Sequence, residues 1–412
     1  MGFFTTGYPI NITFQNGVQF LNNSLYNAFS QCYNFNQPIA IPNSVINMSY
    51  TFSGCINLNQ PIAIPNSVIN MSYTFSSCRN LNQPITIPNS VINMRCTFAQ
   101  CYNFNQPVTI PNNVTDISNI FYNCNNFNQP ITIPNNVTNM SHTFYGCSNF
   151  NQPVNIPNSV TDMRNVFFGC YYLNQPIIIP NSVTNISNAF YRCHNFNQPV
   201  NIPNSVTDIS NIFYNCNNFN QPVNIPNSVI NMRNSFCHCI NFNQPVNIPN
   251  SITDISNILS QCYSFNQPIT IPNNVINMSY TFYHCDNFNQ PITIPNSVIN
   301  MRNSFCHCIN FNQPMIIPSS VTDVDGAFYN CSNFNSNIYM ECSSLTVVTN
   351  ILKAKNNSKI VNIFTIAGSN ANTALHRSDT KSIVGTSITW TDDIDNNCYY
   401  NDRYNIYVYY TL

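Results

Sequence analysis

The sequence predicts a mostly β solenoid in which short coils of the chain stack on one another. A cysteine recurs every 23 residues from Cys32 to Cys331, without insertion or deletion. Two columns of proline keep the same step, one from Pro38 and one from Pro42. Only 6% of the residues are charged, far below the roughly 25% of a typical soluble protein. A fixed period of this length is typical of repeat proteins, in which each unit contacts only its neighbours.

Each 23-residue repeat has its own expected course. The apolar positions of one repeat are Phe35, Ile39, Ile41, Val45, Met48, Phe52 and Cys55. Within the segment Pro38–Pro42 they alternate, which predicts a short strand with Ala40 facing outward. Proline cannot donate to a ladder, so this strand should not exceed three or four residues. Over residues 45–55 the gaps are three and four, which predicts an extended piece and then a helical or 3₁₀ turn.

The ends of the chain depart from the repeat. Residues 1–31 hold a modified copy with six extra positions before the first cysteine, and we expect an N-terminal capping coil. Residues 32–337 form the predicted solenoid. Residues 338–412 contain every lysine and the only tryptophan, and the segments KIVNIFTI, IVGTSITW and YNIYVYY have the composition of strands. We therefore expect a small C-terminal β module that acts as a cap, an anchor or an oligomerisation element.

The repeat resembles a known family. The pattern C-x-x-F/L-x-x-x-x-x-I-P-x-S-V-x-x-I/M-x-x-x-F-x-x-C, seen in CHNFNQPVNIPNSVTDISNIFYNC at residues 193–216, resembles the BspA-like class of leucine-rich repeats. The FNQP tetrad is also similar to the FNIP repeats of protists and giant viruses and to mycoplasma-type surface repeats. The resemblance covers about residues 29–335. It implies a leucine-rich repeat fold with adhesion, surface display or protein binding, and no fixed binding residues.

The C-terminal tail carries a second resemblance. It is similar to terminal modules in repeat-bearing proteins of gut bacteria and their tailed phages. The N-terminus lacks the charged start and apolar core of a secretory signal, and no run of about 18 apolar residues occurs. We therefore expect no membrane insertion, and a place in a virion or on a cell surface without a signal peptide, or alternatively in the cytoplasm.

Cysteine and histidine raise the question of disulfides and metals. The main cysteine column predicts a row of reduced, buried side chains, because disulfides would pair the repeats two by two. The triplets Cys237–Cys239 and Cys306–Cys308 each hold a histidine between two cysteines. The second cysteine of each triplet, Cys239 or Cys308, belongs to the core column, so the three side chains should not converge on one zinc ion. Whether Cys96, Cys237, Cys306, Cys342 and Cys398 are free does not follow from the sequence.

Polar columns predict bonding between neighbouring repeats. Asn34, Asn36 and Gln37 recur in almost every repeat, which predicts ladders of amide hydrogen bonds. An arginine column holds Arg95, Arg164, Arg233 and Arg302, and an aspartate column holds Asp116, Asp162, Asp208, Asp254 and Asp323. The two columns favour ion pairs between repeats, Arg95 with Asp116, Arg233 with Asp208 and Asp254, and Arg302 with Asp323, over a binding stripe.

Variable columns are the candidate binding surface. The outward strand column contributes Thr109, Thr132, Asn155, Asn201, Asn224 and Asn247, and the column after the cysteines contributes Tyr102, Tyr171, His194 and Tyr263. Tyrosine and asparagine suit polar recognition, including that of carbohydrate. The strand column is equally well explained as plain sheet surface.

The sequence carries no enzyme signature. It has one glutamate, Glu341, six scattered histidines and no glycine-rich phosphate loop, and we assign no catalytic, cofactor or metal site. The net charge of −1 gives no reason to expect nucleic acid as a partner. Our leading hypothesis is a phage tail or fibre adhesin that presents the repeats to a host receptor, protein or glycan. The alternative is an intracellular interaction scaffold of a protist or giant virus.

Overall fold

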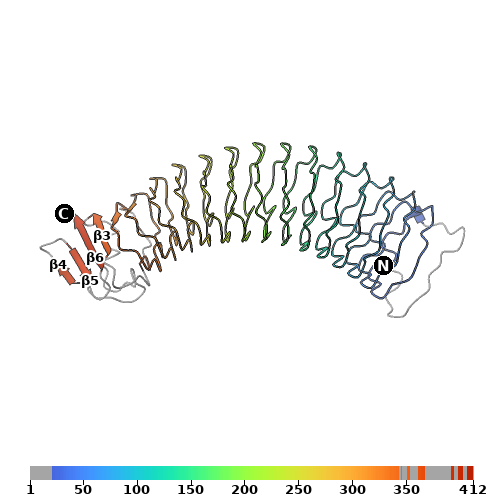
Figure 1. Cartoon of the computed structure of the whole chain (residues 1–412), viewed down its shortest axis with the longest axis horizontal. Coiled ribbons are helices and arrows are strands. Elements are labelled where there is room, and N and C mark those ends of the chain that lie inside the picture. Colours follow the sequence, from blue (N-terminus) through green and yellow to red (C-terminus); the bar gives the residue numbers. More distant parts are fainter. Residues whose placement is uncertain are drawn as a thin grey trace. The chain divides into compact units, whose positions relative to one another are not determined.

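The structure is a computed structural model of the whole chain. It describes residues 21–342, 345, 350–352, 361–366, 391–393, 398–401 and 406–411. The chain divides into two compact units, Met1–Val206 and Thr207–Leu412. In each unit, successive turns of the backbone lie side by side (Figure 1). The N-terminal segment of the predicted capping coil, residues 1–20, lies outside the described residues.

The period of the sequence is also the period of backbone pairing. In the first unit, Asn47 forms a parallel bridge with Asn70, which in turn pairs with Asn93. In the second unit the same column pairs Asn277 with Asn300 and Asn300 with Asp323. Equivalent positions of successive repeats therefore lie next to one another within each unit.

The segment between this bridge and the cysteine follows an alternating bonding rule. Every second amide donates to a carbonyl of the next repeat, as from Met48 to Asn70 at 2.9 Å and from Phe52 to Thr74 at 2.9 Å. The amides between them bond within the repeat: Ser49 N donates to Asn47 Oδ1 at 2.9 Å, and later amides donate to the carbonyl three positions earlier, as from Thr51 to Met48 at 3.0 Å. The predicted 3₁₀-type bonds are thus present, but only at alternate residues. The helical part of the prediction is wrong because the other amides bond to the next repeat.

Two positions of each repeat in this segment have a left-handed backbone conformation. Tyr50 has φ 57° and Gly54 has φ 79°, and both conformations recur in later repeats, as far as Gly326 and Asn330. Tyrosine, cysteine, histidine, arginine and glutamine occupy these positions as well as asparagine and glycine. An L-residue in this region costs roughly 1–2 kcal/mol. We infer that the bonds to the neighbouring repeat impose the conformation.

The predicted strand between the prolines is shorter than expected. In the early repeats it is reduced to a single bridge between Ala40 and Ala63. Three-residue strands form only near the C-terminal end of the described repeats, as β1 (Met315–Ile317) and β2 (Ile338–Met340). Here Glu341 replaces the second proline of the repeat, and its amide donates to Ile317 O at 2.9 Å. The prolines elsewhere lack this donor, which is why the ladder does not extend.

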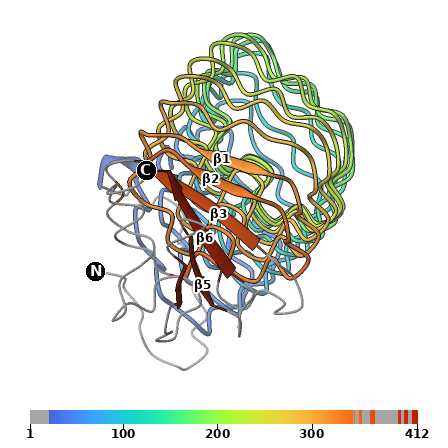
Figure 2. The same ribbon diagram turned by 90° about the vertical axis from the view of Figure 1, so that its left-hand side faces the viewer.

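A six-stranded sheet lies in the second unit. Its other strands are β3 (Val361–Ile366), β4 (Thr391–Asp393), β5 (Cys398–Asn401) and β6 (Ile406–Thr411). The strand order is β1-β2-β3-β6-β5-β4, parallel from β1 to β6 and antiparallel from there to β4 (Figure 2). Strands β3 and β6 fall in two of the predicted segments, and residues 383–390 of IVGTSITW lie outside the described residues.

The N-terminal end of the described chain has a short 3₁₀ element. This element, η1 (Leu21–Asn23), contains Asn22 with a left-handed φ of 57°. Ser24 already bridges to Asn47, and Leu25 and Phe29 are buried. The residues from Ser24 onward therefore join the pattern of the repeats.

The core includes the predicted columns and a further column of hydroxyl and aliphatic residues. Val68, Met71, Phe75 and Cys78 are fully buried. The additional column contains Thr51, whose hydroxyl donates to Leu25 O at 3.0 Å and to Met48 O at 2.7 Å. These hydroxyls are satisfied in the interior, as buried polar groups need to be. The sequence pattern did not identify this column because threonine and serine share it with aliphatic residues.

The cysteine column is a row of buried thiols, as predicted. None of the eighteen cysteines whose side chains the structure describes forms a disulfide, and Cys398 lies outside that set. Thiols throughout the column donate to a carbonyl of the preceding repeat, as from Cys78 to Phe52 O at 3.1 Å and from Cys101 to Phe75 O at 3.0 Å. Burial raises the pKa of the Cys124 and Cys170 thiols well above the usual value, because a thiolate there would lose its hydration.

We predict that the thiols of Cys124, Cys147 and Cys170 are inert in the native protein. Their burial leaves almost no thiolate, which is the reactive form. Titration with a chromogenic disulfide reagent should label them only after denaturant is added. Rapid labelling of most of the column under native conditions would contradict the buried arrangement.

The left-handed columns can be tested at Asn119, whose φ is 58°. Asn119→Val should lower the free energy of unfolding by roughly 1–2 kcal/mol, because a β-branched residue strains this conformation. Asn119→Gly is the matched control and should cost less, since glycine adopts positive φ freely. Chemical denaturation of both variants measures the difference, and equal stabilities would contradict the assigned backbone.

Candidate functional site

The predicted outward strand column does face solvent. Thr109, Thr132, Asn155, Asn201, Asn224 and Asn247 are all exposed. Their neighbours along the chain, such as Val108 and Ile110 beside Thr109, are buried. The six residues do not line either of the two pockets described below. Their exposure fits a polar binding strip and plain sheet surface equally well.

The column after the cysteines contains aromatic residues in contact with one another or with cations. In the first unit the rings of Tyr171 and His194 stack at 4.8 Å with an interplanar angle of 2°. The guanidinium of Arg79 lies over the ring of Tyr102, 5.4 Å from its centroid. In the second unit Tyr263 meets His284 edge-on at 5.8 Å. The structure thus joins two of the four predicted residues directly, Tyr171 and His194.

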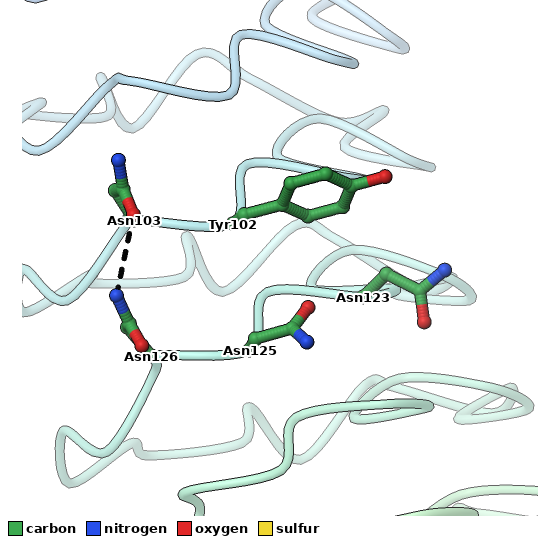
Figure 3. Close-up of a pocket in the computed structure, with 5 residues that line it drawn as sticks. All are labelled: Tyr102, Asn103, Asn123, Asn125 and Asn126. Carbon is green, nitrogen blue, oxygen red and sulfur yellow. Dashed lines mark hydrogen bonds between the residues drawn. The ribbon is translucent and has the colours of Figure 1, made fainter.

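Tyr102 belongs to a pocket of about 400 Å³ in the first unit. The other lining residues are Asn103, Asn123, Asn125 and Asn126, and all five lie on two successive repeats (Figure 3). Asn126 Nδ2 donates to Asn103 Oδ1 at 3.3 Å, as the dashed line in Figure 3 shows. One phenol ring and four amides therefore surround a hollow without a charged lining residue.

The repeat pattern explains how these side chains meet. Tyr102 and Asn125 occupy the column after the cysteine, and Asn103 and Asn126 occupy the next column. Asn123 has a left-handed φ of 56°, which directs its side chain differently from those of its neighbours. In the next repeat Gly146 leaves room for the Asn123 amide, since a Cβ on Gly146 would overlap Asn123 Oδ1.

A partly exposed aromatic row in the first unit escaped the sequence analysis. Tyr122, Tyr145, Phe168 and Tyr191 stack in order, with centroid distances of 4.7, 4.3 and 4.3 Å. Each stands two positions before a core cysteine and is half-buried. The signal was available in that column of the sequence. Because the rings stack face to face, their edges and hydroxyls form the side of the row that reaches solvent.

A second pocket, of about 370 Å³, lies in the second unit. Its lining residues are Tyr280, Tyr283, Asn303, Cys306, His307, Asp325, Gly326, Tyr329 and Asn350. His307 stacks on His284 at 4.0 Å, and Asn330 Nδ2 lies 2.8 Å from His307 Nδ1. Burial, and then the neighbouring His284, lower the pKa of His307. The neutral imidazole is the form that accepts the hydrogen bond from Asn330.

The Cys-His-Cys triplet at this pocket does not converge. Cys308 lies in the core, where its thiol donates to Phe282 O at 3.0 Å, whereas Cys306 and His307 line the pocket. Among the residues that the structure describes, no three His, Cys, Asp or Glu side chains gather closely enough to hold a metal ion.

The predicted ion pairs form only in part. Arg302 lies 3.9 Å from Asp323, as predicted, and 2.7 Å from Asp325. Arg164 pairs within its own repeat, with Asp162 at 2.9 Å. Neither Arg95 nor Arg233 forms an ion pair in the described structure, so those pairings were wrong. The aspartates predicted as their partners instead accept a hydrogen bond from the backbone amide two positions later. Asp116 accepts from Ser118, Asp208 from Ser210 and Asp254 from Ser256.

The predicted amide ladders are confirmed. Asn57 Nδ2 donates to Asn34 Oδ1 at 3.1 Å, and the backbone amide of Asn59 donates to Asn36 Oδ1 at 2.9 Å. Gln83 Nε2 reaches Asn59 Oδ1 at 3.4 Å. Equivalent bonds recur between later repeats of both units, as from Asn128 to Asn105 and from Asn312 to Asn289. They hold the surface columns in register.

The chain belongs to a family of repeat proteins described as mycoplasma proteins of unknown function, DUF285. The family model matches overlapping segments that together span residues 23–363. This match confirms the resemblance of the FNQP repeats to mycoplasma-type repeats. No curated protein matches the chain in sequence.

Solved leucine-rich repeat proteins are similar to the chain. One from Bacteroides ovatus is 20% identical, with a TM-score of 0.43 over 72% of this chain and 82% of its own. A leucine-rich cell surface protein from Faecalibacterium prausnitzii is 22% identical, with a TM-score of 0.41 over 73% and 78%. One from Eubacterium ventriosum is 15% identical, with a TM-score of 0.43 over 86% and 84%. Likeness at this level says nothing about ligands.

In the described residues, no helix has the length and apolar character needed to cross a membrane.

We predict that acid lowers the stability of the protein through His307. The folded protein lowers the pKa of His307, so the unfolded chain binds that proton more readily. Stability should therefore fall as the pH drops through the ordinary histidine pKa of about 6.5. His307→Asn suits the left-handed backbone and should make the loss between about pH 7.5 and about pH 5.5 smaller in chemical denaturation. An identical pH dependence in the variant would contradict this assignment.

Proposed function

We propose that the chain is a leucine-rich repeat solenoid of 23-residue coils that acts as a non-enzymatic recognition protein. The observation that carries the proposal is the surface on either side of the cysteine column in the first unit. There the row from Tyr122 to Tyr191, the Tyr171–His194 stack and the Tyr102 pocket expose rings and amides in a fixed register. Rigid tyrosines with adaptable amides are the chemistry of recognition surfaces.

The partner we propose is a protein or glycan on another surface. The most specific form of this function is a phage tail or fibre adhesin that contacts a host receptor, with the chain placed in the virion or on a cell surface. The similarity of the tail to terminal modules of phage and gut-bacterial proteins supports it. In this form the C-terminal module anchors or oligomerises the chain. Strand β4 is an end strand of the sheet, and such strands offer backbone groups for pairing.

The lack of disulfides among the described cysteines bears on the alternative, an intracellular scaffold. Eighteen described cysteines without a disulfide are typical of a reducing compartment. Their burial and raised pKa values, however, also protect them outside a cell, since oxidation proceeds through the thiolate. The thiols are therefore compatible with the proposed adhesin.

We predict that the purified full-length chain binds a bacterial cell surface through its exposed aromatic residues. A double variant, Tyr171→Ala with His194→Ala, should weaken binding about tenfold if the stacked pair is a hot spot. Tyr26→Ala is the matched control, because Tyr26 is 60% exposed and lies in an early repeat. Labelled protein incubated with a panel of bacterial cells measures both.

Two outcomes are informative: one would overturn the proposed function, and the other would exclude the stacked pair from the contact. The first is the absence of binding to every cell surface, together with recovery of the chain only with soluble proteins of its own cytoplasm. The second is equal binding by the double variant and the wild type, which would remove the stacked pair from the contact. Mass spectrometry of purified virions tests the phage assignment separately.

A further inference from the structure

We propose that the Tyr102 pocket binds one neutral sugar residue, so that the recognised surface is a glycan. The inference rests on the proposed function and names its ligand class. It depends on three features of the pocket: an open aromatic face, amides with unused hydrogen-bonding capacity, and the absence of charge from the lining residues.

The first feature is the open face of Tyr102. Arg79 covers one face of the ring, with its guanidinium carbon 5.4 Å from the centroid. On the other side the next residue of the column is Asn125, so no second ring stacks there in the described structure (Figure 3). Tyr171 shows the contrast, since His194 follows it in the column and stacks on it. An exposed aromatic face is electron-rich and packs favourably against the C–H groups of a sugar.

The second feature is the supply of amides. An asparagine amide has two N–H donors and an oxygen with two lone pairs. Asn126 uses one donor toward Asn103 and accepts one bond from Asn149, so each of its groups keeps capacity. Asn123 and Asn125 add two further amides from the same repeat. Donors and acceptors placed side by side match the adjacent hydroxyls of a sugar, each of which both donates and accepts.

The third feature is charge. All five lining residues are neutral, and Arg79 lies behind the ring rather than in the hollow. A phosphate or carboxylate in the pocket would lose hydration without gaining an opposite charge beside it. This argues against nucleotides and acidic sugars. A flat base would also leave most of the four amides without partners, because a base hydrogen-bonds only at its edge.

The size of the pocket sets the expected affinity. A volume of about 400 Å³ is at the lower end of the range for small-ligand sites. One stacking face and a few exposed hydrogen bonds give weak binding, with a Kd on the order of 1 mM for a single sugar. The register of the pocket is fixed in advance by the Asn103–Asn126 bond and by the space that Gly146 leaves for Asn123.

The test is ligand-observed saturation-transfer NMR on the full-length chain. The probes are glucose, galactose, mannose and N-acetylglucosamine, with sialic acid and adenosine as charged and flat alternatives. At least one neutral sugar should show transfer, strongest at the C–H groups of one face. Tyr102→Ala and Asn125→Ala should each weaken binding about tenfold or abolish it, whereas Tyr102→Phe keeps the stacking and should retain most of it. Tyr33→Ala is the matched control, from the same column and 53% exposed, and should bind as the wild type does.

Each of the following results either supports or overturns the proposed sugar site. Binding of a neutral sugar that is lost in Tyr102→Ala and Asn125→Ala, while their thermal melting stays that of Tyr33→Ala, supports the site. Absence of transfer from every neutral sugar at about ten times the expected Kd, or transfer only from sialic acid or adenosine, overturns it. If cell-surface binding persists after the cells are stripped of glycans by periodate, the inference fails while the proposed recognition function stands.

Discussion

The structure depends on the backbone hydrogen bond that each repeat donates to the next. In the segment between the bridging residue Asn47 and Cys55, alternate backbone amides donate to carbonyls of the following repeat. The N–O distances are 2.7–3.0 Å for Met48, Tyr50, Phe52 and Gly54. A helix would have used those amides internally, and a strand would have sent half of them to the opposite side. The chain meets the requirement through left-handed residues at Tyr50 and Gly54 and at the same two positions of later repeats. Their conformational cost is acceptable because the bonds would otherwise be lost in a buried segment.

Exact periodicity follows from this interaction. When carbonyls and amides pair in a fixed register, equivalent side chains face one another, and each column must suit contact with its own kind. Phenylalanines stack, as Phe52 does on Phe75 at 5.7 Å, and asparagines bond amide to amide. A buried thiol does not need to form a disulfide when it donates to a carbonyl, as Cys78 does to Phe52 O. Charge is poorly suited to a column of like neighbours, and its scarcity agrees with that constraint.

Variation among the columns is therefore where function can reside. In the column after the cysteines, a ring followed by a ring closes into a stack, as at Tyr171 and His194. A ring followed by an amide leaves a hollow, as at Tyr102 and Asn125. The same repeat scaffold thus produces stacked edges or an open pocket, depending on a single position in the next copy. This division gives a repeat protein local differences of surface shape and chemistry at equivalent positions of the repeat.

The period, the apolar columns, the outward strand column and the amide ladders could all be predicted from the sequence, because each depends only on which residues recur at a fixed spacing. The left-handed positions, the reduction of the strand to a single bridge and the failure of Arg95 and Arg233 to form the expected ion pairs could not be predicted in this way. Those depend on competition for the same backbone groups: prolines withhold donors, aspartates bond to nearby amides, and neighbouring repeats claim the rest. Only the tertiary structure decides such competitions, because the competing groups belong to different repeats and meet only once those repeats lie against one another.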